Sequence, residues 1–256
     1  MILANLEASN DLPPDVAILV VDIVGYSKVP ETAMPALREA LDGALAETFG
    51  RVGLAADWAE LNRGRDTGDG WIRIVPASKV TRLVDPGIAF LEEALHRYDG
   101  RRRASDPVLR TRLSVHLGPL SIDYRGDAIN DACRLVDSEA VRSAATAAAS
   151  HNSFTASIIS DEVHRRVVAA GRTSFLAERD FLEVSANVPN KQFSKTAWVH
   201  VPRLSPEILK ANSGLAGPSP AALPQASTGP QLNFAGNVGT SIGTVGSVTM
   251  GDINFA

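Results

Sequence analysis

Strand-like and helix-like patterns alternate along the first two hundred residues of this chain. The segment 16–22 is rich in β-branched residues, and the segment 32–49 carries a large apolar side chain at every fourth position from Leu37 to Phe49. Such alternation is typical of an α/β layer architecture, in which helices cover a sheet. We therefore expect one α/β domain, an α+β sandwich, over residues 1–202.

The remaining patterns predict further elements of the same domain. The Gly- and Asp-rich segment 66–70 is typical of a turn that closes a β-hairpin, here between strands over 58–65 and 71–75. Residues 127–149 are Ala-rich with apolar groups at helical spacing, which predicts one long helix. The other expected elements are helices over 84–98 and 161–169 and strands over 109–117, 155–159 and 196–201.

The composition is that of an ordinary globular domain. The chain has 256 residues, is 45% hydrophobic and 21% charged, and carries a formal net charge of −4, which gives no overall attraction to nucleic acid. The apolar run 16–21 is far shorter than the roughly 20 residues that span a bilayer, so we expect no membrane span. No basic and apolar leader precedes it, and the single cysteine, Cys133, cannot form an intrachain disulfide. These features favour a cytoplasmic protein.

The composition changes after Pro202. From Ala211 to Gly251 the chain carries no charged side chain. We expect a flexible linker over 203–231 and a Gly-rich, β-prone tail over 232–256, in which apolar residues punctuate a Gly, Thr and Ser background. Such a tail can serve in oligomerisation or regulation by stacking with copies of itself, or it can be disordered, and the sequence leaves both open.

Two aspartates stand where a predicted strand meets a glycine turn. Asp22 lies at the end of the first strand, three residues before Gly25, and Asp69 lies in the turn of the predicted hairpin. If the two strands are neighbours, both carboxylates and the exposed carbonyl of Ile23 can hold hard divalent cations, which prefer oxygen ligands. Each aspartate alone has a structural alternative, because an Asp at a turn usually caps backbone amides.

A third polar segment lies in the predicted long helix. Asn130 and Arg134 are four residues apart and therefore share a helix face. Arg presents a planar fork of donors that suits phosphate, and Asn can orient a sugar through hydrogen bonds, although a solvent-facing polar pair is the alternative. For His116 and Trp71 we expect packing roles rather than chemical ones.

Four sequence blocks, taken in order, resemble the class III nucleotidyl cyclase family, which comprises the catalytic domains of adenylate and guanylate cyclases. The blocks are residues 20–27, 66–71, 116–119 and 123–135. The resemblance implies a ferredoxin-like core with a mixed sheet and flanking helices. It also implies that the protein is a phosphorus–oxygen lyase, which cyclises a nucleoside triphosphate to a 3′,5′-cyclic nucleotide and releases diphosphate.

The resemblance assigns the metal site and the assembly. It makes Asp22 and Asp69 the paired ligands of two divalent cations, Mn²⁺ or Mg²⁺, with the carbonyl of Ile23 assisting. In the family, one subunit supplies the metal carboxylates and its partner supplies the base, ribose and phosphate contacts. Because this chain carries both sets, the resemblance implies a head-to-tail homodimer with two composite active sites.

The resemblance also assigns residues to the nucleotide. Asn130 matches the position that orients the ribose, and Arg134 matches the position that meets the triphosphate in the transition state. Lys191 falls where related cyclases carry a phosphate-binding lysine, but the glycines that normally surround that lysine are missing. Arg65, four residues before Asp69, and Asp123, seven before Asn130, match the positions that contact the base.

The choice of base stays open at this point. Family members usually carry Lys for adenine or Glu for guanine at the position of Arg65, so guanylate cyclase is the least favoured assignment. Hydrogen-bond typing of Arg65 and Asp123 admits adenine, cytosine and uracil. We favour UTP, with cyclic UMP as product, because Arg65 can donate to uracil O4 while Asp123 accepts the N3 proton. Cytidylate and adenylate cyclases are the alternatives.

A compact cyclase core fused to a low-complexity tail resembles the pyrimidine cyclases of bacterial anti-phage (Pycsar-type) systems. The products of those cyclases activate a separately encoded effector, so the resemblance implies a role in antiviral defence. A regulatory or assembly module that kept the cyclase fold but lost catalysis is a further alternative. That alternative predicts substitutions at the residues that would bind the metal or the nucleotide. In this chain Asp22, Asp69, Asn130 and Arg134 are all present.

Overall fold

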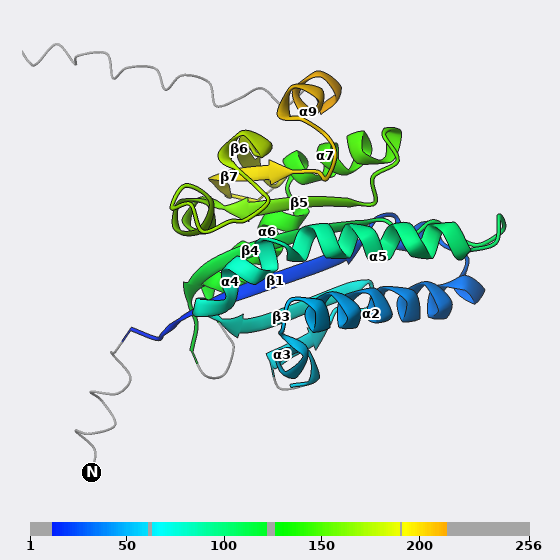
Figure 1. The fold of residues 1–256 in the computed structure, drawn as a ribbon, viewed down its shortest axis with the longest axis horizontal. Helices are drawn as coiled ribbons and strands as arrows, with labels where there is room; N and C mark the ends of the chain where they lie inside the picture. Colours follow the sequence, from blue (N-terminus) through cyan, green and yellow to red (C-terminus); the bar gives the residue numbers. More distant parts are fainter. Residues whose placement is uncertain (1–11, 61–62, 122–125, 190, 214–256) are drawn as a thin grey trace, which may run out of the picture. The chain divides into compact units, whose positions relative to one another are not determined.

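A seven-stranded mixed sheet forms the framework of the protein (Figure 1). The computed structural model describes residues 12–60, 63–121, 126–189 and 191–213. The strands lie in the order β2-β3-β1-β4-β5-β7-β6. Strands β4 and β5 pair in parallel, and every other neighbouring pair is antiparallel.

The elements follow in a β-α-β-β-α-β order through β4, which is the ferredoxin-like arrangement. The strands are β1 (Asp15–Ile23), β2 (Gly64–Asp66), β3 (Gly70–Pro76), β4 (Thr111–Pro119), β5 (Thr155–Ser160), β6 (Leu182–Asn187) and β7 (Ser194–His200). The helices are α2 (Met34–Arg51), α3 (Ala55–Ala59), α4 (Val80–Val84), α5 (Gly87–Arg101), α6 (Asp127–Asp137), α7 (Glu139–Ser150), α8 (Asp161–Val163) and α9 (Pro206–Ser213).

The central strand β1 is buried on both faces, which explains its nearly continuous apolar sequence. Because side chains alternate across a strand, Leu19 and Val21 face the layer that contains α2 and α5. Ile18 and Val20 face the opposite layer, where they pack with apolar residues of α6. Asp22 has the same parity as Ile18 and Val20, so its side chain points to the α6 side of the sheet.

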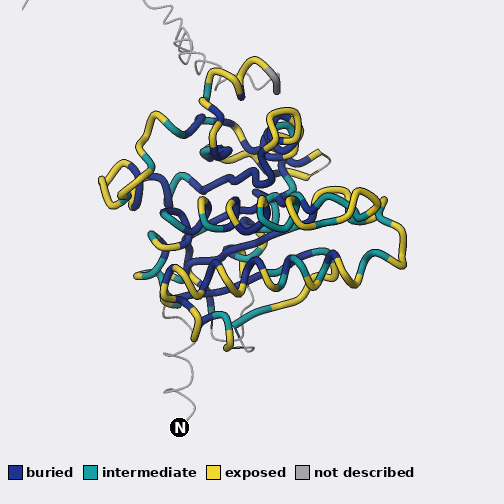
Figure 2. Tube along the Cα trace, turned by 45° about the vertical axis from the view of Figure 1, so that its right-hand side comes forward, coloured by how far each residue is buried: buried dark blue, intermediate teal, exposed yellow. Residues whose placement is uncertain are grey.

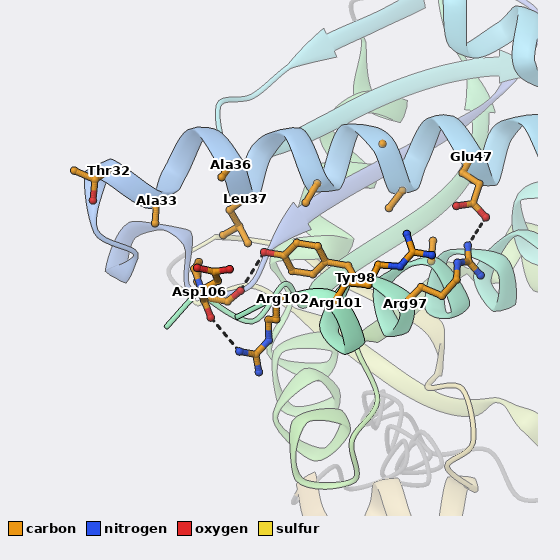
Figure 3. Close-up of a pocket in the computed structure, with 15 residues that line it drawn as sticks. Thr32, Ala33, Ala36, Leu37, Glu47, Arg97, Tyr98, Arg101, Arg102 and Asp106 are labelled. Carbon is orange, nitrogen blue, oxygen red and sulfur yellow. Dashed lines mark hydrogen bonds and ion pairs between the residues drawn. The ribbon is translucent and has the colours of Figure 1, made fainter. Parts of the chain in front are cut away.

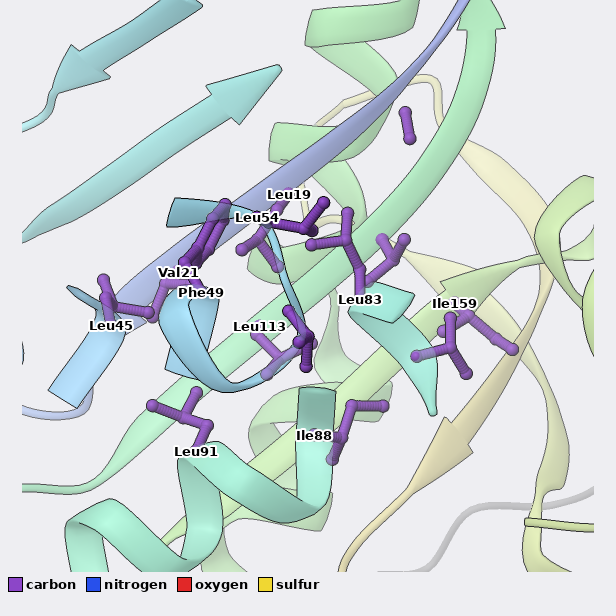
Figure 4. Packing of buried hydrophobic residues seen from close by; sticks show 14 of the residues in the cluster. Leu19, Val21, Leu45, Phe49, Leu54, Leu83, Ile88, Leu91, Leu113 and Ile159 are labelled. Carbon is purple, nitrogen blue, oxygen red and sulfur yellow. The ribbon is translucent and has the colours of Figure 1, made fainter. Parts of the chain in front are cut away.

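Helices α2 and α5 run side by side over the other face of the sheet (Figures 1 and 2). The expected apolar stripe of α2 is buried from Leu37 to Phe49 and packs on the sheet. Figure 4 shows Leu45 and Phe49 of this helix together with Ile88 and Leu91 of α5 in one cluster. Full burial of each such side chain contributes about 1.5–3 kcal/mol, so this layer anchors α2 firmly.

The predicted long helix over 127–149 is wrong in one respect, because the chain breaks into α6 and α7 at Ser138. Ser138 has an extended backbone (φ −64°, ψ 152°), and its hydroxyl donates to the carbonyl of Leu135 at 2.7 Å. A serine hydroxyl that bonds the local backbone competes with the helix and suits the start of a new one. The break lets α6 pack on β1 and β4 while α7 packs on β5 and β6.

The predicted strand over 58–65 is also wrong for most of its length. Only Gly64–Asp66 forms strand β2, and Trp58 lies in the short helix α3. The Trp58 ring packs between Phe49, at a centroid distance of 5.2 Å, and Trp71, at 5.6 Å. Tertiary packing of three aromatic rings therefore overrides the β propensity of Trp.

The far edge of the sheet holds a strand that the sequence patterns did not predict. Strand β6 pairs with β7 along its whole length and forms the sheet edge. Beyond β7, the segment 203–213 contains α9, although it belongs to the range expected as a linker; Leu209 of α9 is fully buried in the cluster that includes α7. The expected tail over 232–256 lies outside the described residues. No helix in the described part of the chain is long and apolar enough to cross a membrane.

Candidate functional site

Asp22 and Asp69, which we call the carboxylate pair, meet where β1 and β3 lie side by side. Asp22 pairs in register with Gly70, and the backbone N–H of Ile23 donates to the carbonyl of Asp69 at 3.0 Å. Gly70 is required here, since a Cβ at this position would lie 1.8 Å from the carbonyl oxygen of Val21. The strand pairing therefore brings together two aspartates that are far apart in the sequence.

The electrostatics of the carboxylate pair are unusual for a surface turn. Burial raises the pKa of the Asp22 carboxyl from 3.8 to about 6. The Arg112 guanidinium opposes this shift through its charge and its hydrogen bond, whereas the nearby Asp69 carboxyl adds to it in both ways. Two acids held this close repel each other when both are ionised, and a bound cation would relieve that repulsion.

Arg112 is a site residue that the sequence reasoning missed. It stands directly opposite Asp22 in the pairing of β1 with β4, and its guanidinium forms an ion pair with the Asp22 carboxylate. Its Nε is buried without a hydrogen-bond partner in the described part of the protein. A signal was present in the alternation of β4, which places Arg112 on the same face as Ser114 and His116 rather than in the apolar layer.

The donor set of this corner fits a hard divalent cation. The carboxylate pair supplies oxygen ligands, and the Ile23 carbonyl lies at the same strand end. Within the described ranges, no cluster of three or more His, Cys, Asp or Glu side chains could hold a metal ion by itself. This donor set suits Mg²⁺ or Mn²⁺, which bind through one or two carboxylates and take their remaining ligands from water and phosphate oxygens.

A second group of polar residues gathers around the solvent-facing side of α6. Asn130 is exposed and Arg134 is partly exposed, one turn apart on this helix. Burial raises the pKa of the Cys133 thiol between them, while the charges of Lys191 and Arg65 act in the opposite direction, so both cations lie within electrostatic reach of this face. We call Asn130, Arg134, Arg65 and Lys191 the α6 group.

An ion pair that the sequence did not predict ties α6 to β7. The Lys195 ammonium lies 2.6 Å from a carboxylate oxygen of Asp131, which is buried, and the Arg134 guanidinium lies 3.8 Å from the other oxygen. The buried ring of Phe193 lies below both cations, at 5.6 Å from Arg134 and 5.9 Å from Lys195. Asp131 therefore links α6 through Lys195 to the strand that follows Lys191, and its charge faces Arg134.

Within one chain the carboxylate pair and the α6 group come from neighbouring elements, and Arg65 lies on β2, four residues before Asp69. Asp22 lies beside Arg112, whereas α6 crosses β4 further along, where the Ser114 hydroxyl donates to the Ala132 carbonyl at 2.7 Å. In the ranges that the structure describes, no hydrogen bond or ion pair joins Asp22 or Asp69 to the α6 group. Each group therefore presents an incomplete set of contacts for a nucleotide.

Three other residues singled out from the sequence complete the survey. Asp123 lies outside the described residues. Trp71 is half-buried, and its indole N–H donates to Asp42 at 2.6 Å. His116 is partly buried on β4, and burial lowers its pKa. Trp71 therefore makes packing contacts at the base of the hairpin, and His116 lies on the face that packs against α6.

A groove of about 580 Å³ lies between α2 and α5, on the opposite side of the sheet from α6 (Figure 3). Small residues such as Ala36 line it from α2, and Tyr98 and Arg97 line it from α5. None of the residues of the carboxylate pair or of the α6 group lines this groove. The size of a cavity is therefore no guide to the candidate site in this protein.

Solved structures of adenylyl and guanylyl cyclases resemble this chain. A bacterial light-regulated adenylyl cyclase aligns with a TM-score of 0.50 and 15% identity, over 78% of this chain and 56% of that one. The guanylyl cyclase Cya2 gives a TM-score of 0.49 and 15% identity, over 75% of this chain and 96% of its own. An adenylate/guanylate cyclase/hydrolase from Silicibacter pomeroyi gives 0.47 and 20%, over 74% and 98%.

These likenesses concern the fold. At 15% identity, the similarity to the light-regulated adenylyl cyclase shows a common architecture, so the expected cyclase-like α/β domain with a mixed sheet and flanking helices is confirmed. No protein-family model matches the chain, and no curated protein matches it. The chemistry must therefore be argued from the site residues themselves.

Proposed function

We propose that this protein is a metal-dependent nucleotidyl cyclase. The observation that carries the proposal is the meeting of Asp22 and Asp69 at adjacent strand ends, with Arg112 beside them, on a cyclase-like fold. A raised pKa that arises from burial and a like charge is typical of a functional carboxylate rather than a turn cap. Divalent cations would balance the negative charge of the two carboxylates, and a polyphosphate would supply the remaining oxygen ligands of the cations.

In the proposed reaction the ribose 3′-oxygen forms a bond to the α-phosphorus, and the bond from that phosphorus to the bridging oxygen of diphosphate breaks. The hydroxyl proton passes to water. Two cations held by Asp22, Asp69 and the Ile23 carbonyl would favour the attacking alkoxide and neutralise the leaving group. Arg112 would contact the phosphates, since its guanidinium lies at the carboxylate pair and a planar fork of donors suits phosphate oxygens.

The α6 group would act on the same nucleotide from a second chain. Asn130 would orient the ribose, Arg134 would stabilise the charge that develops on the triphosphate, and Lys191 would bind phosphate. In the described ranges no hydrogen bond or ion pair joins this group to the carboxylate pair of the same chain, which supports a head-to-tail homodimer with composite sites. Each dimer would then contain two equivalent sites.

For the base we propose uracil. Arg65 belongs to the edge strand β2, and its charge reaches the face of α6, so it can address a base held beside Asn130. Donation by Arg65 to uracil O4 and acceptance of the N3 proton by Asp123 would select UTP and yield cyclic UMP. CTP and ATP are the competing substrates, since each presents an amino donor beside a ring acceptor.

The proposed biological role is antiviral signalling. A cyclic pyrimidine nucleotide would act as a second messenger for a separately encoded effector, and the segment beyond residue 213 would regulate or oligomerise the domain. The support for this role is the low-complexity composition of that segment, with no charged residue from 211 to 251. Infection of cells that carry the protein, followed by measurement of cyclic nucleotides, tests it directly.

Purified protein with Mn²⁺ and each of the four ribonucleoside triphosphates provides the biochemical test. We expect cyclic UMP and diphosphate as products, detected by mass spectrometry. Turnover of ATP far above UTP would replace the proposed substrate, and no turnover of any nucleotide would leave an inactive cyclase-fold module as the better description.

Mixing two inactive variants tests the composite site. Asp69→Ala removes one member of the carboxylate pair, and Asn130→Ala removes one member of the α6 group. In a mixed dimer one of the two sites keeps both sets, so up to about a quarter of wild-type activity should return at equal concentrations. Asp99→Ala is a matched control, because Asp99 of α5 pairs with Arg102, the residue that follows this helix, and belongs to neither group. Failure of the mixture to regain any activity contradicts shared sites.

A further inference from the structure

We propose that Arg38 of α2 is a positioning residue that holds Asp69 in place for cation binding. The inference rests on the proposed function to the extent that the carboxylate pair binds divalent cations. Arg38 lies in the helical layer on the other side of the sheet from α6, yet its side chain is only 13% exposed. A nearly buried guanidinium is unusual and indicates specific polar contacts, because Arg side chains usually keep their charged end in water.

The guanidinium of Arg38 contacts the turn that carries Asp69 at several points. Its Nη1 donates to the carbonyl of Gly70 at 2.7 Å and lies 3.4 Å from the carbonyl of Gly68. Its Nη2 lies 3.2 Å from a carboxylate oxygen of Asp66. The contacts fall on both sides of Asp69, so one side chain spans the whole turn from Asp66 to Gly70.

The turn has few other restraints. It joins β3 to β2, a strand of three residues at the sheet edge. Its own bonds are local: the Gly68 N–H donates to Asp66 at 2.7 Å, and the Thr67 hydroxyl donates to the Asp69 carboxylate at 3.2 Å. The Ile23 N–H bond to the Asp69 carbonyl ties the turn to β1 at its Asp69 end, and Arg38 connects its Asp66 and Gly68 side to a helix anchored in the core.

Arg38 is itself held from two sides. Its Nε lies 3.3 Å from the Asp42 carboxylate one turn later on α2, and its guanidinium lies over the Trp71 ring at 5.0 Å. Asp42 also accepts the Trp71 indole N–H at 2.6 Å. Helix α2 therefore contacts both ends of the Asp69 turn. Arg38 contacts Asp66 and Gly70, and Asp42 accepts the indole N–H of Trp71, the residue after Gly70. The planar guanidinium of Arg can contact Gly70, Asp66 and Asp42 at the same time, whereas the single ammonium of Lys cannot.

The consequence concerns cation affinity. The Asp69 carboxylate must stay beside Asp22 for both to bind one cation, and a turn released from α2 would spend part of its time away from that position. Residues that orient a metal ligand through hydrogen bonds typically contribute about 10–100-fold to metal affinity. Arg38 supports the ligand through the backbone on both sides of it, so the effect should lie near the lower end of that range.

Titration of the full-length protein with Mn²⁺ in the absence of nucleotide, followed by electron paramagnetic resonance of free Mn²⁺, measures this affinity. Arg38→Met should raise the dissociation constant about tenfold, and Arg38→Lys should raise it less. Arg51→Met is the matched control: it lies on the same helix and pairs with Glu93, away from the turn, so wild-type affinity is expected. Asp69→Ala defines the signal that belongs to this site.

Wild-type affinity in a folded Arg38→Met protein overturns the proposal, as does an equal loss in Arg51→Met. If Arg38→Met fails to fold, Arg38→Lys and Asp66→Asn decide, and unchanged affinity in both again overturns it. Cyclisation is measured separately on the same samples. If the wild-type protein binds Mn²⁺ through Asp69 but cyclises no nucleotide, the proposed function is refuted and the inference about Arg38 stands.

Discussion

Replacement of Asp22 by Asn is expected to make the metal-free protein more stable at neutral pH. The Asp22 carboxyl has a pKa of about 6 in the folded protein, mainly because of burial, against an ordinary value of 3.8. Between these values the unfolded chain has already lost the proton that the folded protein keeps. Raising the pH from 4 through 6 therefore lowers the free energy of unfolding, and the loss is complete above pH 6.

The magnitude follows from the difference between the two pKa values. The shift of about 2 units corresponds to at most about 3 kcal/mol, at 1.36 kcal/mol per unit. The side chain is 15% exposed, and solvent screening reduces such an interaction, so we expect about 1–2 kcal/mol. Asn has almost the same shape and still accepts a hydrogen bond from Arg112, so the substitution removes the charge without opening a cavity.

Urea denaturation in the presence of a chelator, followed by tryptophan fluorescence, provides the assay. The difference in unfolding free energy between Asp22→Asn and wild type should be near zero at pH 4 and grow to about 1–2 kcal/mol at pH 7. Titrating groups that do not interact with Asp22 cancel in this difference. Added Mn²⁺ should stabilise the wild type and leave the variant unchanged, because only the wild type retains both members of the carboxylate pair. A wild type that gains stability over the variant as pH rises would show that the Arg112 ion pair outweighs burial, and would refute the reasoning.

Three further predictions concern the strand pairing, the α6 group and the chain end. Gly70→Ala should abolish Mn²⁺ binding and lower the melting temperature, measured by calorimetry, because a Cβ there meets the backbone of β1 at 1.8 Å. Asp131→Asn should lower kcat about tenfold or more while KM changes less, since it removes the charge that faces Arg134 at 3.8 Å and pairs with Lys195; equal kcat would contradict this role. Truncation after Pro202 should lower the melting temperature, because the buried Leu209 is removed.

Sequence patterns predicted the central elements well. The continuous apolar run of β1 and the four-residue apolar spacing of α2 each arise from burial, so the pattern and the element coincide. The patterns failed where a local contact changed the outcome. Ser138 breaks the predicted long helix through a single side-chain bond, and the aromatic packing of Trp58 accompanies its position in helix α3, where a strand was predicted to begin. A periodicity reports which residues are buried, but not which partners bury them.

The same division applies to the candidate site. Amino-acid order alone placed Asp22 and Asp69 at predicted strand ends near glycines, because Gly and Asp are both favoured in turns. Only the fold decided that these two acids are neighbours and that Arg112 stands opposite Asp22. The fold also decided that Arg38 of α2 contacts the turn that carries Asp69. Strand register and desolvation depend on residues that are distant along the chain, so the raised pKa of Asp22 and the contacts of Arg38 with the Asp69 turn exist only once the sheet and its covering helix have assembled.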